Sequence, residues 1–200
     1  WSSDVCSSDL VDYVAGQLRQ MGQFLAQQTG IPVDEGELVR AVARSQRTMA
    51  LFQRGLEKRR GKQVLSDLTS ELFRTAAFHF LLGLPEVERY ARQLLREIET
   101  APPARGKQLL WIHTTPYWVA PLRQLFAQST RVQIAACDMS YEGIVEADPT
   151  KPYEAMARRL VYSPFNGPAQ RRIDRALAMA QTVGADGAIW FCHWGCKHTL

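Results

Sequence analysis

The sequence predicts an α/β protein in which a helical region precedes a domain built on a parallel sheet. Up to residue 101, apolar residues recur at three- and four-residue steps, which is the period of an amphipathic helix. After Pro102-Pro103, short apolar runs alternate with helical stretches, which is typical of parallel strands joined by helical crossovers. We therefore expect a mostly helical region at 11–101 and a parallel-sheet domain at 102–200.

Composition excludes several classes of protein. Hydrophobic residues make up 46% of the chain and charged residues 22%, which indicates a globular rather than a disordered protein. No apolar run approaches the roughly 20 residues of a membrane helix, and no basic-then-apolar leader is present. The net charge of +4 is spread along the chain without the basic stripe of a nucleic-acid-binding protein. Four cysteines without a disulfide framework favour a cytoplasmic location.

Residues 1–10 differ from the rest of the chain. They repeat Ser-Ser-Asp, show no helical or strand periodicity, and resemble translated adapter sequence, so we expect an artefactual tail. The other end stops at Leu200, where a helix should begin. Since three strands are too few for a complete doubly wound sheet, we expect the parallel-sheet domain to be truncated.

Four helices are expected before residue 101. The first ends at Gly30-Ile31-Pro32, and the second begins after the N-cap Asp34 and ends in the basic run 58–62. Cations at a helix C-terminus explain that run better than a phosphate site does. The third, from Ser66, is apolar on several sides and should be central, with His79 as a core histidine. The fourth begins at Pro85. The inward positions of the first helix are Val11, Val14, Leu18, Met21 and Leu25, and those of the fourth are Val87, Tyr90, Ala91, Leu94, Leu95 and Ile98.

Three buried strands are expected at 108–112, 132–136 and 187–192, with helices to about 128, at 154–161 and at 169–183. Each strand is followed by a polar or reactive side chain. These are His113 after the first strand, Cys137 and Asp138 after the second, and Cys192 to Cys196 after the third. Because parallel strands end at the same edge of a sheet, we expect His113, Asp138 and Cys196 to border one crevice.

The segment Cys192-His193-Trp194-Gly195-Cys196-Lys197-His198 holds four candidate metal ligands. One interpretation is that its cysteines are small buried hydrophobes. A second is a zinc site, but structural zinc sites usually combine two separated ligand pairs and only one is present. A third is one reactive thiolate at Cys196, which follows a glycine and should begin a helix. Cys192 should instead pack on the strand face that carries Trp190.

Several motifs together resemble a known family. They are Trp111-Ile112-His113-Thr114-Thr115-Pro116-Tyr117, Asn166-Gly167-Pro168-Ala169, and the segment from Asp186 through His193-Trp194-Gly195-Cys196-Lys197. Over residues 11–200 the chain resembles the 2-hydroxyacyl-CoA dehydratase D-component family, which also contains the ATP-dependent benzoyl-CoA reductase subunits. The resemblance implies a flavodoxin-like or Rossmann-like fold and an oxygen-sensitive subunit that holds a [4Fe–4S] cluster, with flavin in some members.

The resemblance also implies roles for individual residues. Cys196 would be a cluster ligand, His193, Trp194 and Gly195 would surround the cluster, and further cysteine ligands would lie in the family's N-terminal domain and beyond Leu200. Cys192 is left out of this ligand set. His113 and Tyr117 are candidates to line the substrate crevice and to donate hydrogen bonds to the thioester oxygen, unless they only shape the turn at Pro116.

The implied reaction is the dehydration of a 2-hydroxyacyl-CoA thioester. An electron added to the thioester carbonyl gives a ketyl radical anion that expels the α-hydroxide, the β-proton is then lost, and the electron is returned. The implied partners are the acyl-CoA substrate, a related second subunit in a heterodimer, and an ATP-dependent iron–sulfur activator. Two alternatives stay open, namely a benzoyl-CoA reductase-type subunit and a non-catalytic paralogue that binds or activates a partner.

Overall fold

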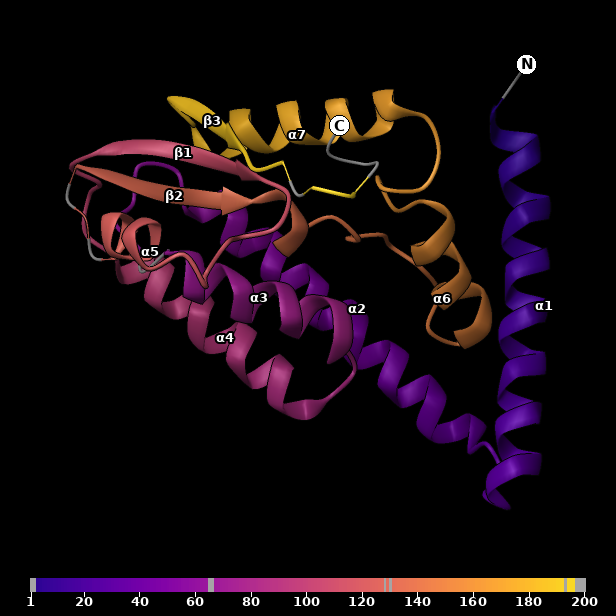
Figure 1. The fold of residues 1–200 in the computed structure, drawn as a ribbon. Coiled ribbons are helices and arrows are strands. Elements are labelled where there is room, and N and C mark those ends of the chain that lie inside the picture. Colours follow the sequence, from indigo (N-terminus) through magenta and orange to yellow (C-terminus); the bar gives the residue numbers. More distant parts are fainter. Residues whose placement is uncertain (1–2, 65–66, 128, 130, 193, 197–200) are drawn as a thin grey trace.

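The computed structural model has an α/β fold in which helices surround a small parallel sheet (Figure 1). It describes residues 3–64, 67–127, 129, 131–192 and 194–196. In these ranges the elements are α1 (Ser3–Thr29), α2 (Glu35–Lys58), α3 (Leu68–Phe80), α4 (Pro85–Thr100), β1 (Lys107–Ile112), α5 (Ala120–Phe126), β2 (Val132–Cys137), the 3-10 turn η1 (Asp138–Ser140), α6 (Pro152–Val161), α7 (Ala169–Val183) and β3 (Gly187–Trp190). The predicted fold class is confirmed.

The sheet is parallel, and its strand order is β2-β1-β3. Leu110 lies beside Ala136 of β2 and Ala188 of β3, and the register between β1 and β2 shifts after Leu109. The prediction of a parallel sheet through these three segments is therefore confirmed. Since all strands point the same way, their carboxyl ends share one edge.

Successive strand residues face opposite sides of the sheet, and each side has its own core. On one side, Leu110 packs with Met179 and Val183 of α7 and with a group of apolar residues from α2 and α4. On the other side, Trp111 packs with Leu68 of α3 and Phe126 of α5. Figure 1 shows α7 along one face of the sheet and α3 and α5 across the other. The first core combines residues from both sides of the predicted boundary at residue 101.

Helix α1 departs from expectation in two respects. It begins at Ser3, so part of the segment predicted to lack periodicity is helical; extending an existing helix by a turn is easier than starting one. The predicted apolar stripe is buried at Val11, whereas Met21 and Leu25 are exposed. The reason is the difference in length between α1 and the helix on which it packs, α6. Helix α1 has 27 residues and is about 40 Å long, whereas α6 has 10 residues and is about 15 Å long, so α6 covers only part of α1.

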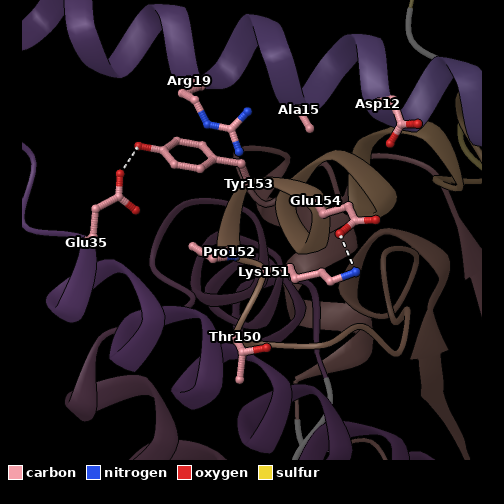
Figure 2. A pocket seen from close by; sticks show the side chains of 9 residues that line it. All are labelled: Asp12, Ala15, Arg19, Glu35, Thr150, Lys151, Pro152, Tyr153 and Glu154. Carbon is pink, nitrogen blue, oxygen red and sulfur yellow. Dashed lines mark hydrogen bonds and ion pairs between the residues drawn. The ribbon is translucent and has the colours of Figure 1, made fainter.

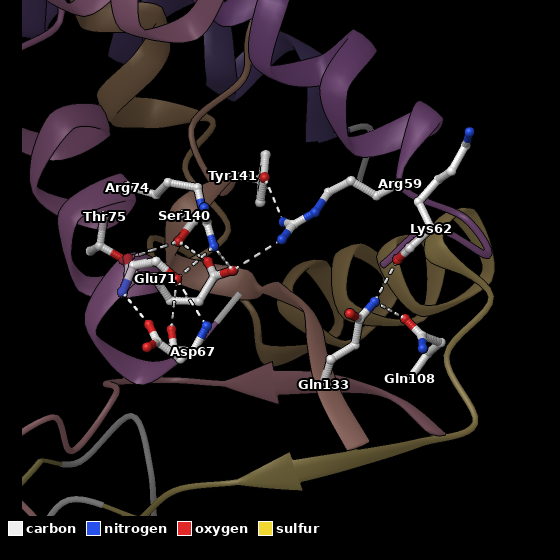
Figure 3. Close-up of polar contacts among 11 residues, drawn as sticks. Arg59, Lys62, Asp67, Glu71, Arg74, Thr75, Gln108, Gln133, Ser140 and Tyr141 are labelled. Atoms are coloured by element: carbon white, nitrogen blue, oxygen red, sulfur yellow. Dashed lines mark hydrogen bonds and ion pairs between the residues drawn. The ribbon is translucent and has the colours of Figure 1, made fainter. Parts of the chain in front are cut away.

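The inward face of α3 is also corrected. Phe73 and Phe80, expected to be central, are exposed. The buried face also carries Glu71, whose carboxylate pairs with Arg74 of the same helix and with Arg59 from the end of α2. Figure 3 shows this buried polar group between α3, η1 and the end of α2. Arg59 belongs to the basic run 58–62, so this cation is an internal ion-pair partner and not a solvent-exposed helix-terminal charge.

Most other predicted elements agree closely with the structure. Asp34 is the N-cap of α2, and its Oδ1 accepts a hydrogen bond from the Glu37 backbone N–H at 2.9 Å. Helix α4 buries the predicted positions Val87, Ala91 and Ile98, although Tyr90 is only partly covered. Strand β3 was expected to be buried and is mostly exposed, because β1 is its one neighbour in the described sheet. Within the described ranges, no helix combines the length and apolar content that a bilayer span requires.

Candidate functional site

Hydrogen bonds to the backbone of His113 link the carboxyl ends of β1 and β2. This residue follows β1 with φ 77°, a backbone conformation that residues other than glycine rarely adopt. Its N–H donates to Asp138 Oδ1 at 2.7 Å, and its carbonyl accepts a hydrogen bond from the Cys137 thiol at 3.4 Å. These contacts hold the strained turn in one position. The predicted juxtaposition of His113 with Asp138 is confirmed.

The second oxygen of Asp138 ties the same edge to α7. Its Oδ2 accepts a hydrogen bond from Arg172 at 3.0 Å, and both side chains are largely buried. The Arg172 guanidinium also lies over the Phe165 ring, 4.3 Å from its centroid. A buried carboxylate and its cation therefore fix the position of α7 relative to the strand ends.

The His113 imidazole faces the segment that follows β3. Its Nε2 lies 3.7 Å from Cys196 Sγ, and its Nδ1 lies 3.0 Å from Thr114 Oγ1. If the Thr114 hydroxyl donates to Nδ1, then Nε2 carries the proton and points it at the sulfur. The histidine is 7% exposed and the cysteine is half-buried. The structure thus brings Cys196 to the same edge as His113 and Asp138, as predicted.

The segment after β3 holds the remaining predicted site residues. Gly195 has φ 87°, and a Cβ added there would meet no atom within 4 Å, so this turn uses the freedom of glycine and leaves space beside Cys196. Trp194 is 93% exposed. His193 lies outside the described residues, as do the four residues in which a helix was expected to start.

Cys192 is exposed, contrary to the expectation that it packs. Strand β3 ends at Trp190, so Cys192 is not part of the strand, and Trp190 itself is exposed. The alternation of strand faces therefore does not extend to this cysteine. Cys137, in contrast, is fully buried, and burial, followed by the charge of Asp138, raises the pKa of its thiol well above the usual value. Cys137 is a core thiol and not a reactive one.

Tyr117, predicted at the crevice, lies on the turn that follows His113. Its ring is partly exposed and packs edge-on against Trp118, with centroids 5.3 Å apart. In the described part of the chain, no hydrogen bond joins its hydroxyl to His113 or Cys196. The turn itself is fixed by local bonds, including the Tyr117 N–H to Thr115 O at 2.8 Å.

One acidic side chain, Glu142, and one basic side chain, Arg172, lie near this edge and were not singled out from the sequence. Burial, followed by the charge of Asp138, raises the pKa of Glu142 to about 8. Glu142 Oε1 lies 3.3 Å from His79 Nε2, which also lies 2.8 Å from Met139 O. Burial lowers the pKa of His79, consistent with the expected core histidine. Neither Glu142 nor Arg172 has a local sequence motif, because their partners come from distant segments.

An apolar pocket of about 420 Å³ opens beside the same edge, between the ends of β1 and β3 and the first half of α7. Its lining includes Ile112, Phe165, Arg172, Ile173, Leu177 and Trp190. A larger pocket of about 690 Å³ lies between α1 and α6, and the described residues that line it include none from the three strands (Figure 2).

Several polar side chains in the larger pocket contact one another. Lys151 lies 3.5 Å from Glu154, and Tyr153 donates a hydrogen bond to Glu35 at 3.2 Å (Figure 2). Arg19 stacks 4.8 Å from the centre of the Tyr153 ring. We therefore place the candidate site at the sheet edge, where the reactive groups and the smaller pocket meet.

The donor set at the sheet edge is that of a single thiol with an imidazole neighbour. Cys196 is half-buried, and it lies next to a glycine turn and to a nitrogen of His113. Among the described residues, no group of three or more His, Cys, Asp or Glu side chains is arranged to hold a metal ion. Cys196 thus fits one ligand position of an iron–sulfur cluster, not a complete ligand set.

Comparison with known proteins identifies a family. The family model described as 2-hydroxyglutaryl-CoA dehydratase, D-component, matches residues 4–200. The match includes most of the first ten residues as well as all elements of the sheet. None of the curated proteins compared with the chain shows significant similarity to it.

Proposed function

Because the chain belongs to the 2-hydroxyglutaryl-CoA dehydratase D-component family, we propose that it is a subunit of a 2-hydroxyacyl-CoA dehydratase. The reaction is the removal of water from a 2-hydroxyacyl-CoA thioester to give an enoyl-CoA. The observation that carries the proposal is the meeting of His113, Asp138 and Cys196 at the carboxyl edge of a parallel sheet. This is the edge at which α/β proteins bind their ligands.

A [4Fe–4S] cluster is the proposed cofactor, with Cys196 as one ligand and Gly195, His193 and Trp194 around it. Thiolate-bound clusters supply electrons at potentials as low as about −700 mV, which suits one-electron reduction of a thioester carbonyl. The ligand position is supported by the half-exposed thiol and by the His113 nitrogen 3.7 Å from its sulfur.

The chain's own residues would bind and orient the substrate. His113 and Tyr117 are proposed as donors to the thioester oxygen, which gains negative charge as a ketyl radical anion forms. His113 is held for this role by its bonds to Asp138 and Thr114. Tyr117 has an exposed ring on the same turn. Loss of the α-hydroxide and then of the β-proton, with return of the electron, completes the elimination.

The proposed partners are a related second subunit and an ATP-dependent activator that delivers the electron, all in the cytoplasm. The word "component" in the family description supports an enzyme of several parts. Phe73, Phe80 and Trp194 are large apolar side chains exposed on this chain.

The test is turnover by the assembled enzyme without oxygen. The protein is purified with its partner subunit and activator, supplied with ATP and 2-hydroxyacyl-CoA thioesters, and assayed for enoyl-CoA. We expect turnover in the parent protein and a loss of at least about 100-fold in His113→Ala, since a positioned donor contributes about this much. Cys192→Ala is the matched control and should retain turnover. Reduction of benzoyl-CoA instead would indicate the reductase alternative, and no turnover of either substrate would indicate a non-catalytic paralogue.

A further inference from the structure

The apolar pocket beside the strand ends has the size of a small-ligand site. Its volume of about 420 Å³ lies in the range of about 300–1,000 Å³ that is usual for such sites. Ile112 at the end of β1 and Trp190 at the end of β3 line the pocket. Ile173 and Leu177, one turn apart on α7, also line it and are both exposed. Such exposed apolar side chains around one hollow mark a binding surface.

The charge inside this pocket is already neutralised. Among the described residues that line it, Arg172 is the one that carries a charge, and its guanidinium donates to Asp138 Oδ2 at 3.0 Å. The flat side of the same guanidinium lies against Phe165, which also lines the pocket. A carboxylate entering here would lose its hydration and would have to compete with Asp138 for Arg172. An uncharged apolar group meets no such cost.

Two residues that line the pocket are linked directly to the reactive edge. Ile112 directly precedes His113, whose ring faces Cys196. Arg172 leads to the same histidine through Asp138. A thioester whose carbonyl lies at His113 would therefore have its acyl side chain within reach of the pocket.

We propose that this pocket binds the acyl side chain of the thioester and selects an uncharged apolar or aromatic side chain over one that ends in a carboxylate. The proposal rests on the proposed function, and it assigns a substrate class different from the dicarboxylic glutaryl group in the family description. Phe165 and Trp190 supply the aromatic walls, and Ile173 and Leu177 supply the apolar side.

The test is equilibrium binding of three pantetheine thioesters to the chain by calorimetry. They carry 4-methylpentanoyl, 3-phenylpropanoyl and glutaryl groups, and the glutaryl compound has a free carboxylate. We expect the two apolar thioesters to bind at least about tenfold more tightly than glutaryl-pantetheine. Equal or tighter binding of glutaryl-pantetheine would overturn the proposal.

A matched pair of variants locates the binding. Leu177 in the pocket and Leu125 on α5 are both 57% exposed, so lysine at either position leaves the core intact. Leu177→Lys should weaken 3-phenylpropanoyl-pantetheine at least about fivefold and strengthen glutaryl-pantetheine, while Leu125→Lys should change neither. If Leu177→Lys leaves both affinities unchanged, the thioesters bind elsewhere, for instance at the apolar pocket lined by Phe73 and Leu81, and the proposal is wrong.

The binding test and the turnover test can fail independently of each other. Selective binding without any dehydration by the assembled enzyme would retain this inference and reject the proposed function. Dehydration of a glutaryl substrate together with unselective binding would retain the proposed function and reject this inference.

Discussion

A few buried charges determine how the elements around the sheet edge fit together. Asp138 accepts hydrogen bonds from the His113 backbone and from Arg172, so one carboxylate links β1, η1 and α7. Glu71 likewise links α3 with η1 and with the end of α2. Its Oε1 lies 2.5 Å from Arg74 and 3.4 Å from Arg59, and its Oε2 accepts from Ser140 at 2.9 Å (Figure 3).

Removing Glu71 should destabilise the protein strongly. Glu71→Ala leaves two buried guanidinium groups without their carboxylate, which typically costs about 3–5 kcal/mol. The control is Glu37→Ala, which removes an exposed carboxylate that also contacts two arginines, Arg40 and Arg44. Urea denaturation should show a large decrease in the free energy of unfolding for Glu71→Ala and a much smaller one for Glu37→Ala. Equal decreases would contradict the importance of burial.

Glu142 should make the protein less stable as the pH rises. Its pKa of about 8 in the folded state lies above the ordinary value of 4.5, so the folded protein holds a proton that the unfolded chain has lost. From about pH 6.5 to pH 8 the free energy of unfolding should fall by roughly 1.5 kcal/mol. The charged groups around this carboxyl are His79 from α3, Asp138 from η1, Arg159 from α6 and Arg172 from α7.

The choice of pH range separates Glu142 from His79. Burial lowers the pKa of His79 below 6.5, so the unfolded chain binds a proton at this histidine more readily than the folded protein does. Through His79 the free energy of unfolding therefore falls as the pH is lowered, which is the opposite direction to the effect of Glu142. Denaturation at several pH values checks the prediction. Glu142→Gln should flatten the dependence above pH 6.5, whereas the exposed Glu146→Gln should keep it. A parent protein whose stability does not change in this range would show that Glu142 ionises normally.

At the scale of elements, helix ends depend on a few residues with special conformations. Helix α7 ends at Gly184, which has φ 66° and whose N–H bonds to Gln181 O at 3.2 Å. The Ala185 N–H bonds back to Ala180 O at 2.9 Å, so the last carbonyls of the helix are satisfied. Gly16 lies inside α1, where glycine has no such role.

The same substitution should therefore have opposite effects at these two glycines. Gly184→Ala places a side chain in the left-handed conformation and should cost about 1 kcal/mol. Gly16→Ala meets no atom within 4 Å and should stabilise the protein by about 0.5–1 kcal/mol, because alanine favours the helix. Thermal unfolding of the two variants should shift in opposite directions. A shift in the same direction for both would mean that one of these conformations is wrong.

Element boundaries could be predicted from sequence where they depend on local residues. The bounds of α7 were predicted at 169–183 because Pro168 and Gly184 flank a regular apolar period. The buried face of α3 could not be predicted, because Glu71 is buried only through its contacts with Arg59 and Ser140, far away in the sequence. The exposure of Cys192 was missed because it depends on where β3 ends and on what lies beside it.

At the scale of the whole molecule, the parallel sheet explains why distant residues form one site. His113, Asp138 and Cys196 are separated by up to 83 positions, and the common direction of the strands brings them together. Their meeting could be predicted from strand–helix alternation alone. Arg172 and the apolar pocket could not, since they depend on how α7 lies across the sheet.

The most direct test of the account is the iron content of the protein with Cys196 or Cys192 changed to alanine. Both thiols lie after β3, but Cys196 faces His113 Nε2 at 3.7 Å, whereas Cys192 is exposed outside the strand. The subunit, assembled with its partner, is reconstituted with iron and sulfide without oxygen, and iron and visible absorbance are measured. We predict that both collapse in Cys196→Ala and persist in Cys192→Ala. The opposite pattern would contradict the assignment of the ligand, and loss in both variants would indicate a local site formed by the two cysteines.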